Sequence, residues 1–549
     1  MSDSEDKIKE VELEQEERLA MQIAKVNNLT YLSAHGAVSV VPIVDKEKAQ
    51  SVKAVVIKQD EANLYLAVQN PKDKNTQTLI EELKKQYQHI EVFVISEPTL
   101  NHLIESYPEK HEGGGESLTE KVYISDNDLS KLIEKDITIN EIEDTLKNIS
   151  KTDISKALEA LLSNTINMST TDIHIEPQEK TTVIRIKIDG ILHEVANIEE
   201  HMYKLMLSRI KLLSDLKLNI HDQAQEGNFS VAFKDRDIEI RTSILPSEYG
   251  EDIALRVLDP ESILSLEELG MRHDLFNTLK KYLSYPQGLI LVTGPTGSGK
   301  TTTLYACINF VKKEATKIIT IEDPIEYRLE GITQTEVNED ENYTFASGLK
   351  AILRQDPDTL LISELRDISS AEPALQATLA GRKVFSTLHT IDASGTAPRL
   401  IDMGADASTV ASALSLSMSQ RLVRRLCENC KELQKVTKEE YDSISNMVKE
   451  MPKNIPGTTI TENSQLSVPK KGGCLRCKGT GYKNRIAVFE LFSASKKVRE
   501  KILENPTEDD MRAIMKEQDE TNMLQDAVIK ILEGVTSIEE VRRVFGEFL

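Results

Sequence analysis

The chain has 549 residues, with 67 Lys and Arg against 90 Asp and Glu, which gives a formal net charge of −23. This acidic balance argues against a dedicated DNA- or RNA-binding protein, because such proteins need a basic surface to release counterions from phosphates. Apolar residues make up 39% of the chain, enough for several folded cores, and the length predicts about three to four domains.

Residues 1–15 are acidic and lack the apolar core of a secretory signal. No apolar run approaches the roughly 20 residues that are needed to span a bilayer. We therefore expect a cytoplasmic protein without direct membrane insertion, which reaches a membrane only through partners.

Residues 16–107 have the pattern of a small α+β domain. The segments LAMQIAKV and LIEELKKQY are helix-like, and VKAVVIKQ, LYLAVQN and EVFVIS are strand-like. Residues 108–150 open with PEKHEGGGESLTE, whose three consecutive glycines and many charges predict a linker.

A second α+β domain is expected over residues 151–262. ISKALEALLSNTI places apolar residues on one helical face, and TVIRIKID alternates isoleucine with charged residues, as a half-buried strand does. Asp189-Gly190 follows at once and is a strong hairpin-turn signal. DIEIRTSIL and DIALRVLD are two further strand-like segments.

Over residues 263–420, short apolar strands alternate with helices. The strand-like segments are GLILVTG, KIITIED, TLLISE and KVFSTLHT. This alternation is typical of an α/β fold with a parallel, doubly wound sheet.

A phosphate-binding loop lies between the first of these strands and an amphipathic helix. GPTGSGKT matches G-x-x-x-x-G-K-[ST], in which backbone N–H groups form an anion nest at a helix N-terminus. Lys300 can reach the β- and γ-phosphates, and the Thr301 hydroxyl suits Mg²⁺. The expected nucleotide-binding residues are Gly294, Pro295, Thr296, Gly297, Ser298, Gly299, Lys300, Thr301 and Thr302.

Acidic residues follow two of the other strands. Glu364 ends TLLISE, where it is well placed to orient a water molecule or accept its proton. IEDPIE offers Glu322, Asp323 and Glu326 at another strand end, and His389 follows VFSTLHT, where it could sense the γ-phosphate. The alternatives are solvated strand-end charges and, for His389, a structural histidine.

Residues 421–485 hold two CxxC pairs, Cys427 with Cys430 and Cys474 with Cys477. Four thiolates in tetrahedral geometry are the usual ligands of structural Zn²⁺; the alternative is four reduced, unligated thiols. The segment of 43 residues between the pairs is expected to be an insertion. Residues 486–549 are expected to form a helical region.

GPTGSGKTTTLY, ITIEDPIEY, LRQDPD and STLHT, in this order, resemble the secretion ATPases that drive type II secretion and type IV pilus assembly. The resemblance runs from about residue 150 to 549 and includes TDIHIEP, RLVRRLC and GYKNRIAVFELF. It implies a RecA-like motor domain after a PAS-like α+β domain, with residues 16–107 as a docking domain. It also implies ATP as the nucleotide, with Asp323, Glu326, Glu364 and His389 lining it.

The same resemblance implies a homo-hexamer that powers either pilus assembly or assembly of the type II secretion pseudopilus. The implied partners are an inner-membrane platform protein and a membrane-bound docking protein, which would hold the ring at the inner face of the cell membrane. No nucleic-acid partner is expected, and the charge argues against a nucleic-acid translocase.

Three positions depart from the family pattern. Ser363 stands where the family has Gly, Arg382 where it has the first His of the His box, and Asn228 where it has an Arg. These changes keep open an alternative function as a weakly active structural subunit of the ring.

Two further family arginines, Arg241 and Arg256, are present. We expect them to complete the γ-phosphate site through a movement of the second domain of the same chain or of a neighbouring subunit, because developing charge there needs cationic partners. The alternative is that they only pair with nearby acids such as Glu239 or Asp252.

Overall fold

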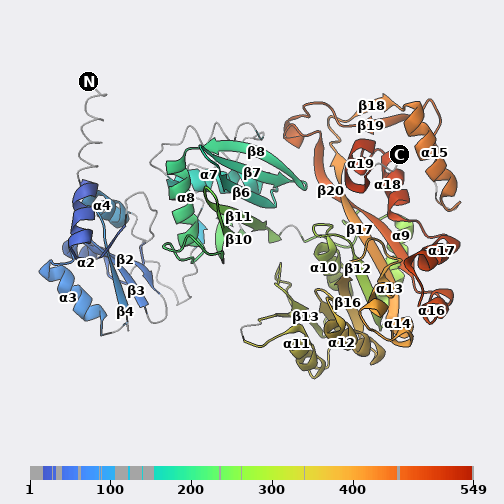
Figure 1. Ribbon diagram of the computed structural model, residues 1–549, viewed down its shortest axis with the longest axis horizontal. Helices are drawn as coiled ribbons and strands as arrows, with labels where there is room; N and C mark the ends of the chain where they lie inside the picture. The colour runs from blue at the N-terminus through green and yellow to red at the C-terminus, as the bar shows by residue number, and fades with distance from the viewer. Residues whose placement is uncertain are drawn as a thin grey trace. The chain divides into compact units, whose positions relative to one another are not determined.

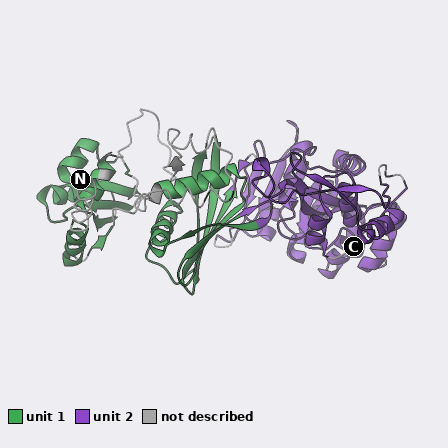
Figure 2. Cartoon of the chain, turned by 90° about the horizontal axis from the view of Figure 1, so that it is seen from above, with its two compact units in different colours: residues 1–135, 140–186, 192–257 green, residues 136–139, 187–191, 258–549 purple. Residues whose placement is uncertain are grey.

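The computed structural model describes residues 16–27, 29–32, 40–41, 43–59, 63–85, 87, 89–105, 121–123, 139, 142, 154–233, 236–260, 263–338, 341–453, 455 and 458–546. The predicted acidic tail and most of the predicted linker lie outside these residues. The chain divides into two compact units, one of residues 1–135, 140–186 and 192–257, the other of residues 136–139, 187–191 and 258–549 (Figure 2).

The first unit begins with a small α+β domain. A helix at residues 16–27 precedes a four-stranded sheet in the order β1-β4-β3-β2 (Figure 1). The strands are β1 (Thr30–Tyr31), β2 (Ala54–Gln59), β3 (Asn63–Val68) and β4 (His89–Val94), and the helices are α2 (Lys46–Val52), α3 (Lys74–Leu83) and α4 (Glu97–Glu105). The sequence pattern did not predict α2, because only Ala49 and Val52 of its seven residues are buried.

The first unit also contains a larger α+β domain with the sheet order β5-β9-β10-β11-β6-β7-β8. Its elements are β5 (Lys121–Tyr123), α7 (Ile154–Asn167), β6 (Asp172–Pro177), β7 (Thr182–Ile188), β8 (Ile191–Ile198), α8 (Glu200–Leu213), β9 (Gln225–Phe233), β10 (Arg236–Ser247) and β11 (Gly250–Leu258). Asp189 and Gly190 have φ values of 49° and 83°, which a tight hairpin turn requires. Three residues of the predicted linker form β5, which pairs with β9.

The second unit is built on a seven-stranded sheet in the order β14-β13-β15-β16-β12-β17-β20. Its strands are β12 (Gly288–Thr293), β13 (Ile318–Glu322), β14 (Thr333–Glu336), β15 (Thr359–Ile362), β16 (Lys383–Leu388), β17 (Leu414–Leu426) and β20 (Tyr482–Ser493). All neighbouring strands run parallel except β17 and β20. The predicted parallel α/β fold is confirmed.

Both faces of this sheet are buried. Along β12, Leu289 and Leu291 join one hydrophobic cluster, and Ile290 and Val292 join another. Successive side chains of a strand point to opposite faces, so each face needs its own layer of helices. The helices of this fold are α9 (His273–Ser284), α10 (Lys300–Val311), α11 (Phe345–Leu353), α12 (Ile368–Leu379), α13 (Thr396–Asp402) and α14 (Ala407–Ala413).

The cysteine-containing region lies between two strands of the same sheet. β17 continues past the predicted boundary at residue 420, and β20 crosses the one at residue 485. The segment between the cysteine pairs contains β18 (Glu432–Lys435), α15 (Lys438–Glu450) and β19 (Gln465–Val468), and the second pair flanks η2 (Leu475–Cys477). The helical end of the chain consists of α16 (Lys496–Ile502), α17 (Glu508–Glu517), α18 (Met523–Leu532) and α19 (Ile538–Phe545). Among the described residues, no helix combines the length and apolar character that a membrane crossing requires.

Candidate functional site

The phosphate-binding loop joins the carboxyl end of β12 to α10, as its sequence context predicted. Gly294, Gly297 and Gly299 have φ values of 142°, 76° and 88°, a backbone region that residues with a Cβ rarely adopt. A Cβ on Gly294 would lie 2.5 Å from the carbonyl oxygen of Gln420. Glycine is therefore required here both for the backbone angle and for the close approach of β17.

Gln420 also supports the loop through its side chain, because its Nε2 donates to the carbonyl oxygen of Ser298 at 2.8 Å. Gln420 is fully buried. The sequence analysis did not assign it a role, since it lies 122 residues after Ser298 and no spacing rule connects the two.

Lys300 lies in the first turn of α10 and closes over the loop. Its Nζ donates to the carbonyl oxygens of Gly294 at 2.8 Å and Pro295 at 3.2 Å. Burial lowers the pKa of Lys300, while the carboxylates of Glu364 and Glu326 raise it. The charges of both acids therefore act on the amine of Lys300.

Glu364 and His389 meet at the carboxyl edge of the sheet, beyond β15 and β16. His389 Nε2 lies 3.0 Å from Oε1 of Glu364. The other carboxylate oxygen, Oε2, accepts a hydrogen bond from Nε of Arg366 at 3.2 Å. Each oxygen of Glu364 therefore has its own nitrogen partner, which fixes the orientation of the carboxylate.

Arg366 connects two of the predicted acidic segments. Its Nη1 lies 3.1 Å from Oδ2 of Asp323, which follows β13. Burial alone would lower the pKa of Arg366, but its hydrogen bond to Glu364 and the charges of Glu364 and Asp323 raise it above its usual value. The sequence analysis missed Arg366, although its position two residues after Glu364 is a usable signal.

Glu322 does not belong to this group. It is buried at the end of β13, where Tyr305 donates its hydroxyl to one carboxylate oxygen. The other oxygen accepts hydrogen bonds from Thr320 Oγ1 at 2.6 Å and Gln334 Nε2 at 3.0 Å. Glu322 is therefore a structural carboxylate between β13 and its neighbours, and not the solvated charge that the sequence allowed.

Two of the departures from the family pattern leave this edge of the sheet intact. Ser363 contributes its backbone, donating its N–H to Ile321 O at 2.9 Å and accepting the hydroxyl of Thr387 at 2.7 Å. Arg382 lies just before the amino end of β16 and pairs with Asp356. Because β16 spans six residues, Arg382 is roughly 20 Å of strand away from His389.

The arginines of the first unit have acidic neighbours there. Arg241 lies 3.6 Å from Glu239, as the simpler alternative predicted, whereas Arg256 pairs with Asp172 at 3.1 Å rather than with Asp252. Arg241 lies opposite Asn228 in the register of β9 and β10.

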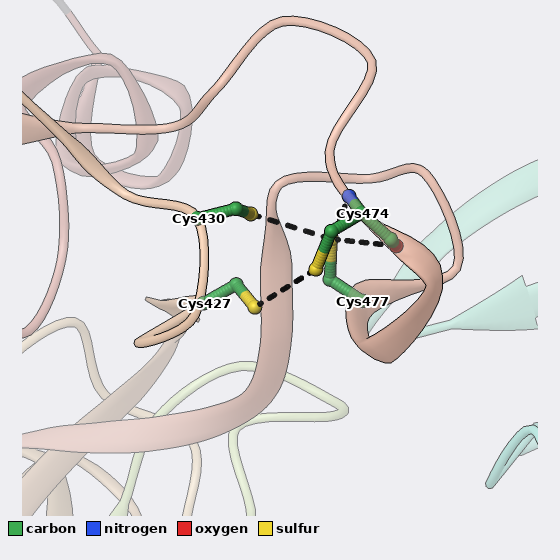
Figure 3. Close-up of side chains that lie close together, drawn as sticks. All are labelled: Cys427, Cys430, Cys474 and Cys477. Atoms are coloured by element: carbon green, nitrogen blue, oxygen red, sulfur yellow. Dashed lines mark hydrogen bonds between the residues drawn. The ribbon is translucent and has the colours of Figure 1, made fainter.

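The four predicted zinc ligands form one cluster, in which two pairs from distant segments face each other (Figure 3). Their sulfur atoms all lie within 4.8 Å of one another. Three of the separations, Cys427 to Cys474, Cys430 to Cys477 and Cys474 to Cys477, are 3.7 to 3.8 Å. Sulfurs bound at about 2.3 Å to one tetrahedral Zn²⁺ lie about 3.8 Å apart, so the donor set fits the ion.

Backbone groups also favour thiolates in this cluster. Cys477 Sγ accepts hydrogen bonds from the N–H groups of Cys474 at 3.0 Å and Gly481 at 3.2 Å. Such N–H···S contacts stabilise the negative charge that a metal-bound sulfur carries. Cys307 lies on α10 and is buried in a hydrophobic core apart from the cluster.

Comparison with known proteins identifies the family. The protein-family model described as "Type II/IV secretion system protein" matches residues 147–543. The chain is 39% identical to the putative type II secretion system protein E of Escherichia coli (strain K12) over 73% of this chain and 79% of that protein. It is 36% identical to the type II secretion system ATPase E of Vibrio cholerae over 78% of this chain and 82% of that protein.

The X-ray structure of the Legionella pneumophila ATPase DotB has the same fold. It superposes with a TM-score of 0.51 at 17% sequence identity, over 70% of this chain and 94% of that chain. With the phosphate-binding loop and its acidic partners in place, these similarities establish that the chain belongs to the type II/IV secretion system protein family and is an ATPase.

Proposed function

We propose that the chain is the motor subunit of a homo-hexameric ring that hydrolyses ATP to power type IV pilus assembly or pseudopilus assembly in type II secretion. The observation that carries this proposal is the meeting of Glu364 with His389 at the strand ends beside the loop that holds Lys300. A nucleotide-binding structural protein needs the loop, but it does not need an oriented carboxylate.

In this proposal the loop, residues 294–302, holds the phosphates of ATP, and the Thr301 hydroxyl binds Mg²⁺. Glu364 orients the attacking water and accepts its proton, and His389 contacts the γ-phosphate. Asp323 and Glu326 line the site of the metal-bound phosphates. Arg366 binds both Glu364 and Asp323 and so fixes their positions relative to each other. Mg²⁺ supplies charge neutralisation when bound.

The alternative, a weakly active structural subunit, loses two of its three supports. Ser363 contributes two hydrogen bonds through its backbone, and Arg382 lies at the opposite end of β16 from His389. Only Asn228, beside Arg241, remains as a change that could reduce the positive charge available to the γ-phosphate.

We also propose that the four cysteines bind one structural Zn²⁺, which joins the end of β17 to the turn before β20. The N-terminal domain, residues 16–107, is proposed to dock onto a membrane-bound protein of the machinery, with a platform protein of the inner membrane as the second partner. Through these partners the ring would lie at the inner face of the membrane.

Steady-state ATPase measurements on purified full-length protein, combined with analytical ultracentrifugation, test the motor proposal. We expect Mg²⁺-dependent hydrolysis of ATP whose specific activity rises with protein concentration. In ultracentrifugation, we expect the ring to assemble in the presence of a non-hydrolysable ATP analogue. Hydrolysis that is absent under all these conditions, with nucleotide binding intact, would instead support the structural subunit.

A further inference from the structure

A buried carboxylate connects the segment after His389 to the C-terminal helices. Glu490 lies on β20 and is 4% exposed. One of its oxygens accepts a hydrogen bond from the N–H of Ala393 at 2.8 Å, and the other accepts one from the N–H of Met523 at 3.1 Å. Ala393 is four residues after His389, and Met523 is the first residue of α18.

The same segment is bound to the phosphate-binding loop at its other end. Thr390, next to His389, donates its N–H to the hydroxyl of Thr293 at 2.9 Å, and the two hydroxyls are 2.7 Å apart. Thr293 is the last residue of β12 and precedes Gly294. Residues 390–393 are therefore held between the loop that binds phosphate and a carboxylate that binds α18.

A second contact holds the segment from the surface. Asp392 accepts hydrogen bonds from the N–H of Gly395 at 3.0 Å and from Arg512 Nη2 at 2.7 Å. Arg512 belongs to α17. Both α17 and α18 thus reach the segment after His389, one through Arg512 and the other through Glu490.

Keeping Glu490 buried works against the stability of the fold. Burial raises the pKa of Glu490 to about 7, although the N–H of Ala393 lowers it. An apolar side chain would serve better if β20 needed only a packed core at this position. What a carboxylate adds is the ability to bind two backbone N–H groups from separate segments at once.

We propose that Glu490 is a positioning residue for ATP hydrolysis, which holds the segment after His389 so that the imidazole meets Glu364, and which makes this geometry dependent on the placement of α18. This inference rests on the role of His389 given above. A displacement of α18 would be transmitted through Glu490 to His389, and α18 is part of the region that follows the motor sheet.

A double-mutant cycle in turnover tests the proposal. We expect Glu490→Gln to lower kcat about 10-fold while KM changes by less than about 2-fold, because the amide cannot accept both N–H groups. In a His389→Ala background the same substitution should cause no further loss, because its effect passes through His389. Equal losses in both backgrounds, or no loss in the wild-type background, would overturn the proposal.

Glu520→Gln is the matched control. Glu520 also accepts a backbone N–H from β20, that of Ser493 at 3.1 Å, and burial raises its pKa to about 7 as well. Among the described residues, Glu520 forms hydrogen bonds with Ser493 and Gln518, which both lie outside residues 390–395. We expect this variant to keep kcat close to the wild-type value, so a comparable loss of kcat would point to general damage and count against the proposal.

Hydrogen exchange measured by mass spectrometry on the full-length variants separates this inference from the assignment of His389. Amides of residues 390–397 should exchange faster in Glu490→Gln than in wild type, and at the wild-type rate in Glu520→Gln. If His389→Ala alone leaves turnover intact, the role of His389 fails, while the exchange data still decide whether Glu490 holds the segment. Unchanged exchange in Glu490→Gln would refute that holding role.

Arg512→Ala provides a second route if Glu490→Gln does not fold. Arg512 is about half exposed, so its removal leaves the core intact. We expect a several-fold fall in kcat that again disappears in the His389→Ala background. A fall of equal size in both backgrounds would contradict the proposed connection.

Discussion

His389 Nε2 lies 3.0 Å from Oε1 of Glu364, although the two residues leave the sheet from different strands. Parallel strands bring their carboxyl ends to one edge, so residues 25 positions apart become neighbours. Arg366 holds the second oxygen of Glu364 and reaches Asp323 as well. Each of the two oxygens of the Glu364 carboxylate thus has its own nitrogen partner.

Lys300→Ala should reduce ATP turnover at least about 100-fold, because the amine supplies the charge at the β- and γ-phosphates. Lys312→Ala is the matched control, since Lys312 follows the last turn of the same helix and bonds the carbonyl oxygen of Glu330. The measurement is steady-state phosphate release. A Lys300→Ala variant that turns over ATP at the parental rate would refute the assignment of this loop.

Glu364→Gln should retain ATP binding and lose turnover by about 100-fold, because the amide can still be held by Arg366 but cannot accept a proton. Binding is measured with a fluorescent ATP analogue and turnover by phosphate release. Glu372→Gln, an exposed acid on α12, controls for the change of charge and should behave as wild type. Parallel losses of binding and turnover in Glu364→Gln would contradict the role of general base.

The native protein should contain one Zn²⁺ per chain by elemental analysis. Cys474→Ser should release the metal and lower the thermal stability of the cysteine-containing region, because metal binding in such sites contributes to folding free energy. Cys307→Ala, which removes a thiol outside the cluster, should keep the metal. Native protein without zinc would refute the site.

Arg241→Ala combined with Arg256→Ala should lower kcat much more than it weakens ATP binding, if both cations serve the developing charge on the γ-phosphate. Arg185→Ala is a suitable control, because Arg185 is paired with Glu176 in the same sheet and has no expected role in turnover. A double variant with full turnover would leave the ion pairs with Glu239 and Asp172 as the whole function of these arginines.

Replacement of Glu520 should change how stability depends on pH. Burial raises the folded-state pKa of Glu520 to about 7, above its ordinary value of 4.5. The folded state therefore binds the proton more tightly than the unfolded state, and stability falls as the pH rises from about 4.5 to about 7. Glu520→Gln should remove part of this fall.

Thermal unfolding of wild type and Glu520→Gln at pH 5 and pH 8 provides the measurement. At each pH, the free energy of unfolding of the variant is compared with that of wild type. This difference should be more favourable to the variant at pH 8 than at pH 5, on the order of 1–3 kcal/mol. Identical pH dependence in the two proteins would show that Glu520 does not titrate in this range.

Local patterns in the sequence were sufficient to predict the phosphate-binding loop and the parallel strands of the sheet around it. The glycines of residues 294–299 have no alternative that fits their backbone angles, and the strands of a doubly wound sheet are apolar throughout because both faces are covered. The four cysteines of the cluster could also be predicted from the sequence. Two CxxC pairs supply the four sulfur atoms that a tetrahedral site needs, whatever segment lies between the pairs.

Other features depended on contacts between residues far apart in the chain. Arg366 pairs with Asp323, which follows the neighbouring strand β13. Gln420 bonds to Ser298, 122 residues earlier, and Glu490 bonds to the backbone of Ala393 and Met523. Periodicity and spacing describe neighbours along the chain, whereas these polar groups are placed by strand order and by the packing of the C-terminal helices. The tertiary structure alone therefore decided which buried polar side chains hold the segment after His389, because a hydrogen bond depends on the positions of both partners in space.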